Sequence, residues 1–263
     1  MSSEFIDGFR RPATQGNGIR DLNPITVLVA LASLAAIAVA IPGLLAPTLI
    51  CASFVVIAFC AGIGPSFAST YAKLFAVVGL ILFVLRAAFI PGEQILFEVG
   101  PIAVSMEGVI EGARFTLVVM AMCGAVTLFF SLIPMKYLML ALELKGMTPK
   151  ASYVILASFQ SIIDLGKNAK VVMDAQKSRG IETEGSIAQR VRAFVPILAP
   201  VFLAAMNETE ERALALDARA FNSRQAHSHL VILHGIRTRD IVVLCAAVTL
   251  AAASILGALL TWY

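Results

Sequence analysis

The chain has 263 residues, of which 59% are hydrophobic and only 14% are charged, and its mean hydropathy is +0.88. A soluble domain carries roughly 25% charged residues, so this composition excludes an ordinary water-soluble globular protein and predicts a membrane protein. The formal net charge of +3 excludes little by itself, but its distribution is informative, because residues 25–135 hold 7 charged side chains and residues 136–240 hold 24.

The first 24 residues are polar and contain Arg10, Arg11 and Arg20, so we expect a tail and not a cleaved signal peptide. Four apolar segments follow, each about as long as a helix that crosses a bilayer, and a fifth closes the chain. These segments are residues 25–41, 44–61, 73–90, 113–133 and 240–261. The predicted fold class is therefore all-α, a polytopic membrane protein with about five transmembrane helices.

The polar stretch before the last span is predicted to be helical. Residues 135–146 are typical of an amphipathic helix at the membrane interface. A helix over 151–178 would start after Thr148-Pro149 and end at Gly180, with an apolar stripe along one side. A second helix over about 187–222 is apolar first and charged later, and Pro196 and Pro200 are expected to kink it. The stripe consists of Ile155, Phe159, Ile162, Ile163 and Gly166.

Lysine and arginine in the connecting segments predict the orientation. The N-terminal tail and residues 136–239 carry these cations and would lie inside, in the cytoplasm. Residues 91–112 contain four glutamates and no lysine or arginine, and would lie outside, as would the C-terminus with Trp262 and Tyr263. Arg86, within the third span, lies about a turn from its outer end and could snorkel to the interface; a functional role for it stays open. The predicted division is a tail (1–24), transmembrane helices 1–4 (25–134), long cytoplasmic helices (135–239) and the last transmembrane helix (240–263).

No catalytic or nucleotide-binding motif is present, such as G-x-x-x-x-G-K-[ST], H-E-x-x-H or G-x-S-x-G. The four cysteines lie in apolar segments without a C-x-x-C pair and are interpreted as small hydrophobic residues. His227, His229 and His234 could hold a metal weakly, but no carboxylate or cysteine completes the set of ligands. We therefore prefer the interpretation that this stretch is a solvent-exposed turn that leads to the last span. We expect no enzyme activity, no cofactor, no metal and no nucleic-acid partner.

Two short arginine steps stand at the predicted ends of the two polar helices. One is Ser178-Arg179-Gly180 and the other is Ala218-Arg219-Ala220. Either arginine alone could simply stabilise the dipole at a helix C-terminus. Their pairing favours a second interpretation, because small neighbours let a helix tip enter a groove and arginine offers a five-donor fork for carboxylates and carbonyls. Two such tips suggest two similar sockets on a two-fold partner.

The sequence resembles the transmembrane coupling (T) component of energy-coupling factor (ECF) type ABC transporters, the EcfT/CbiQ family. Its members carry two X-Arg-X motifs, most often Ala-Arg-Gly, at the ends of cytoplasmic coupling helices, and the two arginine steps match them. The stretches "ERALALDARAF" and "DLNPITVL" also look like the family's second-helix ending and its entry to the first span. One departure is Ala220, where glycine is usual.

The resemblance implies a non-catalytic subunit of a prokaryotic cell-membrane importer for a vitamin or a transition-metal ion. Two ATP-binding cassette subunits would dock on the coupling helices, and a small membrane protein (the S component) would capture the substrate. A conventional ABC permease is the alternative, although "ETEERALALDARAF" lacks the glycine and leucine-proline that follow such a permease's glutamate-alanine-alanine signature, and the spans hold almost no polar groups for a substrate path. A membrane-embedded enzyme or scaffold is a further alternative.

Overall fold

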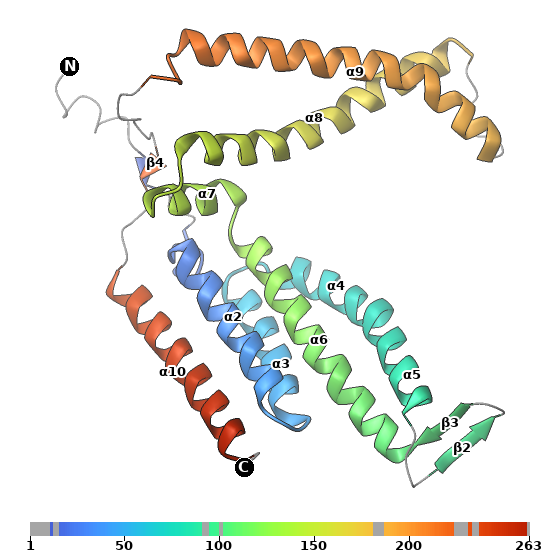
Figure 1. Cartoon of the computed structure of the whole chain (residues 1–263), viewed down its shortest axis with the longest axis vertical. Coiled ribbons are helices and arrows are strands. Elements are labelled where there is room, and N and C mark those ends of the chain that lie inside the picture. The colour runs from blue at the N-terminus through green and yellow to red at the C-terminus, as the bar shows by residue number, and fades with distance from the viewer. Residues whose placement is uncertain are drawn as a thin grey trace. The chain divides into compact units, whose positions relative to one another are not determined.

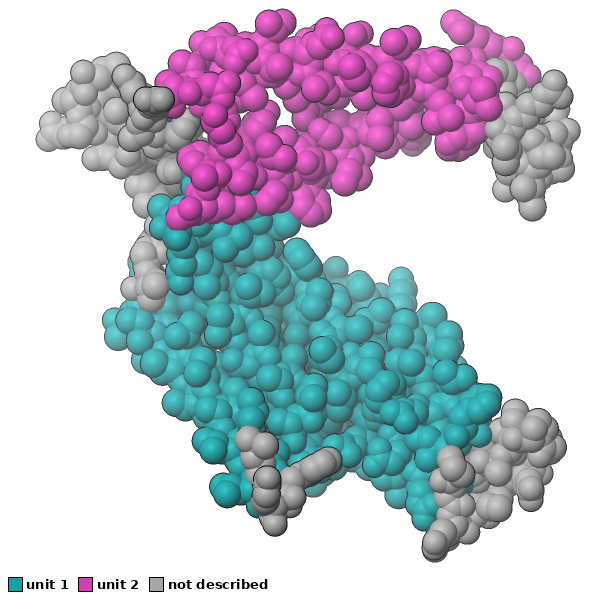
Figure 2. Space-filling view, viewed as in Figure 1, with its two compact units in different colours: residues 1–145, 229–263 teal, residues 146–228 magenta. Residues whose placement is uncertain are grey.

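The computed structural model describes residues 11–12, 16–90, 95–99, 102–180, 187–223, 231–232 and 237–261. It is dominated by helices (Figure 1), so the predicted all-α polytopic membrane fold is confirmed. The chain forms two compact units, one made of residues 1–145 with 229–263 and the other of residues 146–228 (Figure 2).

The first unit holds the apolar helices. Among the described residues three helical stretches are long and apolar enough to cross a membrane, namely Gly64–Phe89, Met106–Leu132 and Thr238–Ala258, and α2 and α3 are shorter apolar helices. The five predicted apolar helices are therefore all present. In chain order the helices of this unit are α2 (Pro24–Ala40), α3 (Leu45–Cys60), α4 (Gly64–Leu74), the π-helical turn η1 (Phe75–Gly79), α5 (Leu80–Phe89), α6 (Met106–Leu132), α7 (Met135–Leu144) and α10 (Thr238–Thr261).

Two helices begin more than one turn earlier than predicted. The helix containing the expected span 73–90 starts at Gly64, because the polar stretch before residue 73 still buries Phe67 and Tyr71 against the core. Helix α6 starts at Met106 and not at 113, because the Ser105 hydroxyl caps it by accepting the Gly108 N–H at 2.9 Å. The expected outer segment 91–112 is thus partly helical.

Short strands accompany the helices and were not predicted. Strands β2 (Ile95–Val99) and β3 (Ile102–Ser105) pair antiparallel between α5 and α6. Strands β1 (Arg11–Pro12) and β4 (Val231–Ile232) pair in parallel and join the start of the chain to the segment before α10. They contain few residues, so the fold class is unchanged.

Helix α6 packs against α3, α4 and α5, with glycines at the closest approaches. A Cβ added at Gly124 would lie 2.9 Å from the Tyr71 ring and 3.0 Å from Phe54. The Tyr71 hydroxyl donates a hydrogen bond to the Met120 carbonyl at 3.0 Å. Small residues let helices approach closely in lipid, where van der Waals packing and interhelical hydrogen bonds drive association.

Helix α10 lies along α2, and one buried carboxylate caps both. Asp240, only 3% exposed, accepts the Asn23 N–H at 3.0 Å and the Arg237 N–H at 2.8 Å. Asn23 in turn caps α2 with its own side chain, which accepts the Ile25 N–H. The start of α2 at "LNP" is therefore stabilised by a hydrogen bond to Asp240 of the last helix, which is 217 residues away in the sequence.

The second unit is built from α8 (Pro149–Ser178) and α9 (Ile187–Ala218). Helix α8 begins as predicted, with Thr148 accepting the Ala151 N–H and Pro149 in the first turn. Helix α9 runs on as one element through Pro196 and Pro200. It ends at Ala218, earlier than the expected residue 222.

Candidate functional site

The first arginine step is the C-terminal cap of α8. Ser178 is the last helical residue, and Arg179 follows at the cap position with φ −87° and ψ 5°. Gly180 has φ +86° and donates its N–H to the Lys177 carbonyl at 2.9 Å. Glycine suits this position because a left-handed conformation is strained for a residue with a Cβ.

The second arginine step ends α9 in a Schellman cap. Ala218 is the last helical residue and Arg219 is the cap. The Ala220 N–H bonds the Asp217 carbonyl at 2.9 Å, and the Phe221 N–H bonds the Leu216 carbonyl at 3.0 Å. Ala220 has φ +54°, and among the described residues no other non-glycine has a positive φ. The two arginines therefore hold the same position relative to their helix ends.

All six residues of the two steps are exposed. Neither guanidinium forms a hydrogen bond or an ion pair with the part of the chain that the structure describes. The Ser178 hydroxyl only donates back to the Asp174 carbonyl in its own helix, at 3.1 Å. Both arginines thus present their full set of donors outward.

The structure does not bring the two arginines together. Helices α8 and α9 run antiparallel, because Tyr153 near the start of α8 packs on Phe221 just past α9, with ring centroids 5.3 Å apart. The ends that carry the arginines consequently lie at opposite ends of the pair (Figure 1). From Tyr153 to Arg179 helix α8 rises about 40 Å at ~1.5 Å per residue, so one small socket cannot hold both.

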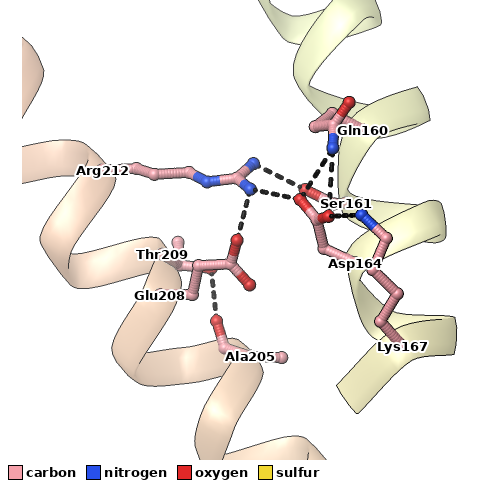
Figure 3. Close-up of polar contacts among 8 residues, drawn as sticks. All are labelled: Gln160, Ser161, Asp164, Lys167, Ala205, Glu208, Thr209 and Arg212. Atoms are coloured by element: carbon pink, nitrogen blue, oxygen red, sulfur yellow. Dashed lines mark hydrogen bonds and ion pairs between the residues drawn. The ribbon is translucent and has the colours of Figure 1, made fainter. Parts of the chain in front are cut away.

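A polar cluster joins the two helices between these ends (Figure 3). Arg212 of α9 donates to the Ser161 hydroxyl at 3.0 Å and to the Asp164 carboxylate at 3.1 Å, both on α8. The same guanidinium pairs with Glu208 one turn earlier on α9. Arg212 and Asp164 are 30% and 22% exposed, so this ion pair is better shielded than a typical surface pair.

Asp164 is the centre of this cluster. It also accepts from the Gln160 amide at 3.0 and 3.1 Å and from the Lys167 ammonium at 3.2 Å. The hydrogen bond from Gln160, followed by that from Lys167, lowers the pKa of Asp164 below its ordinary value. The sequence predicted the helix over 151–178 and an apolar stripe that does not include Asp164. It did not indicate that Arg212 would reach across to Asp164.

The apolar stripe of α8 is largely exposed, and Ile162 borders a small pocket that residues of α9 also line. Ile162 is 68% exposed, and Phe159 and Ile163 are also exposed. Helix α9 exposes its own large apolar residues, including Val195 and Phe202. Exposed apolar surface of this extent on two helices is typical of a site that contacts a partner or lipid.

The other sequence candidates have simpler outcomes. Arg86 of α5 lies over the Phe115 ring of α6, with its guanidinium carbon 4.3 Å from the ring centre. His227, His229 and His234, like Trp262 and Tyr263, lie outside the described residues. Among the residues that the structure does describe, no group of three His, Cys, Asp or Glu side chains could hold a metal ion.

Comparison with known proteins gives consistent matches. The family described as "CbiQ: Cobalt transport protein" matches residues 15–229, a range that includes both arginine steps. The energy-coupling factor transporter transmembrane protein EcfT 1 of Listeria monocytogenes is 29% identical over 189 residues, 66% of this chain and 70% of the relative. The EcfT protein of Thermanaerovibrio acidaminovorans is 34% identical over 157 residues, 55% of this chain and 58% of the relative. That of Thermosediminibacter oceani is 24% identical over 190 residues, 69% of this chain and 71% of the relative.

Proposed function

The chain belongs to the EcfT/CbiQ family of energy-coupling transmembrane components, and from that membership we propose that Arg179 and Arg219 anchor two ATPase subunits of an importer. Each arginine would sit in a socket of one ATP-binding cassette subunit. The chain itself would be a non-catalytic, multi-pass cell-membrane subunit, with the N-terminus and both coupling helices in the cytoplasm and the C-terminus outside.

The observation that carries this proposal is the equivalence of the two helix tips. Both arginines are exposed cap residues without a partner among the described residues, and each is followed by a residue in the left-handed conformation. Their separation of about 40 Å along α8 favours one socket for each. Planar guanidinium groups bind carboxylates and carbonyls with several hydrogen bonds at once, which lysine cannot reproduce.

The cluster around Arg212 supports a mechanical role for the helix pair. It ties α8 to α9 between the two tips by two hydrogen bonds of 3.0 and 3.1 Å. A displacement of either tip would therefore move both helices. The exposed apolar side chains of the pair offer a surface for a separate small membrane protein that captures the substrate, so ATPase closure would be transmitted to that protein.

The substrate class is proposed more broadly. The family description names cobalt transport, whereas the names of the three relatives specify no substrate. We therefore propose uptake of a vitamin or of a transition-metal ion such as cobalt or nickel. The ligand carried by the capture protein that co-purifies with this chain decides between them.

The test is co-purification of the ATPase subunits together with substrate uptake. Removing one arginine should cost roughly 2–5 kcal/mol at its socket, while the second socket keeps much of the ATPase pair attached through effective concentration. Arg179→Ala and Arg219→Ala should each reduce uptake strongly and leave partial assembly. The double variant should release the ATPases, and lysine should restore function only in part.

Lys170→Ala is the matched control. Lys170 is also an exposed cation on α8, but it lies within the helix and not at its C-terminal cap. It should leave assembly and uptake unchanged. If the double arginine variant kept its ATPases and transported normally, both arginines would be ordinary helix caps and the proposal would be wrong.

A further inference from the structure

The first unit has an apolar groove along the α4–η1–α5 helix and α6. Its volume is about 540 Å³, within the range of small-ligand sites. Its lining combines small residues with larger apolar ones, and among them only Thr116 contributes a polar group. The lining residues are Phe75, Ala76, Gly79, Leu80, Phe83, Ala113, Thr116 and Leu117.

The local helix geometry explains the groove. The π-helical turn Phe75–Gly79 places one extra residue in the helix and brings Gly79 against α6. A Cβ at Gly79 would lie 3.3 Å from the Phe75 ring and 3.5 Å from the Thr116 methyl, so the space depends on the missing side chain. Turns of this type inside α-helices are frequent at functional sites.

Arg86 lies on α5 one turn beyond Phe83, the last residue of that helix that lines the groove. It follows Phe83 by three residues and Gly79 by seven, which places all three on the same face of the helix. Its guanidinium lies over the ring of Phe115, the neighbour of Thr116 on α6. Helix α5 ends at Phe89, so the guanidinium is about one turn from the end of the span and within reach of the headgroup level.

Within the described residues this cation has no anionic partner, and its guanidinium contacts the Phe115 ring. Arg114, one residue before Phe115, is instead paired with Glu111 at 3.6 Å. An arginine held on a ring still has N–H donors directed outward, and a phosphate matches their fork geometry. Basic sites between transmembrane helices bind lipid headgroups for this reason.

We propose that this groove binds one phospholipid, with an acyl chain along α5 and α6 and the phosphate on Arg86. The charge of Arg86 favours a lipid over a partner helix as the occupant, because a membrane supplies phosphate at this depth on every lipid. An anionic headgroup should bind better than a zwitterionic one, since choline brings a second, repelling cation. The site is independent of the arginine steps and of the proposed coupling function.

The experiment uses the full chain with Trp262→Phe, which removes its single tryptophan, and Phe83→Trp, which puts a reporter in the groove wall. The protein is reconstituted in phosphatidylcholine vesicles with increasing fractions of phosphatidylglycerol brominated in its acyl chains. Bromine quenches tryptophan on contact, so the quenching curve reports which lipid occupies the groove. We expect phosphatidylglycerol to be preferred about fivefold, the effect of roughly one cation near a membrane surface.

Arg86→Gln should abolish the preference, and Arg86→Lys should retain part of it. Arg114→Gln is the matched control and should keep it, because Arg114 is already paired. Ala113→Leu, which adds a large side chain to the groove lining, should remove the component of quenching that saturates while leaving helix content unchanged by circular dichroism. Quenching no greater than the fraction of brominated phosphatidylglycerol in the vesicle predicts, or a preference that survives Arg86→Gln, would overturn the proposal. If Ala113→Leu instead left quenching intact and displaced a membrane partner, the groove would belong to a protein helix.

Discussion

Replacing Ala220 by glycine should stabilise the end of α9. Ala220 is held at φ +54° by the two hydrogen bonds of the Schellman cap, in which its own N–H and that of Phe221 take part. A residue with a Cβ costs roughly 1–2 kcal/mol in the left-handed region. Glycine removes this strain, so the departure from the family's usual glycine has a measurable energetic consequence.

The magnitude follows from two opposing contributions. Relief of backbone strain raises the stability by about 1–2 kcal/mol. The greater conformational freedom of glycine in the unfolded chain lowers it by about 0.4–1 kcal/mol. The net gain for Ala220→Gly is therefore about 0–1.6 kcal/mol, with a central value of about 0.8 kcal/mol. Gly180→Ala at the equivalent position of α8 should have the opposite sign and a similar or larger size, because its φ is +86°.

Hydrogen exchange measured on the full chain in detergent tests each variant locally, at the amides of residues 216–221 for Ala220→Gly and at those of residues 175–180 for Gly180→Ala. A gain of about 0.8 kcal/mol slows exchange roughly fourfold where opening is local. Gly257→Ala is the control, since nothing lies within 4 Å of a Cβ added there. Faster exchange near Ala220 in the glycine variant, together with no loss in Gly180→Ala, would refute the reasoning from backbone strain.

Three further predictions concern packing, capping and pH. Gly124→Ala should destabilise the first unit by about 1–3 kcal/mol through overpacking, seen as a lower unfolding temperature than that of Gly257→Ala; equal temperatures would contradict it. Asp240→Ala should lower the stability by about 2–3 kcal/mol, because two backbone N–H groups lose their acceptor. Asp240→Asn should lower it less, because one amide oxygen remains. Thermal unfolding that ranks the two variants in the reverse order would be inconsistent with the double cap. Because the pKa of Asp164 is lowered in the folded chain, its stabilising effect is present above the ordinary pKa of about 3.9 and is lost as pH falls through the lowered value. Exchange near Arg212 should then rise only below about pH 4, and Asp164→Asn should abolish this rise; an unchanged rise in that variant would assign it to another carboxylate.

Local features of the chain that depend on few residues were predictable. Apolar length indicated five membrane helices, since a bilayer demands a minimum hydrophobic span whatever the helices contact. Thr148 and Pro149 marked the start of α8 and Gly180 marked its end, because caps act through neighbouring residues. The same locality made both arginine steps visible as paired helix ends.

Features that depend on contacts between distant segments of the chain could not be predicted from the sequence. The start at Gly64 was missed because burial of Phe67 and Tyr71 against α6 outweighs the polarity of their neighbours. The reach of Arg212 to Asp164 joins residues 48 positions apart, and no local pattern encodes it. These contacts depend on how helices approach one another.

The sequence by itself determined that this is a helical membrane protein with two equivalent arginine tips, because hydrophobic length and helix caps are short-range properties. Only the tertiary structure decided that the tips lie at opposite ends of an antiparallel pair, since the direction of α9 against α8 is fixed by contacts such as Tyr153 with Phe221. It also decided that Ala220 adopts the left-handed conformation of the glycine it replaces. That conformation is imposed by the hydrogen bonds of the cap, which outweigh the local preference of alanine.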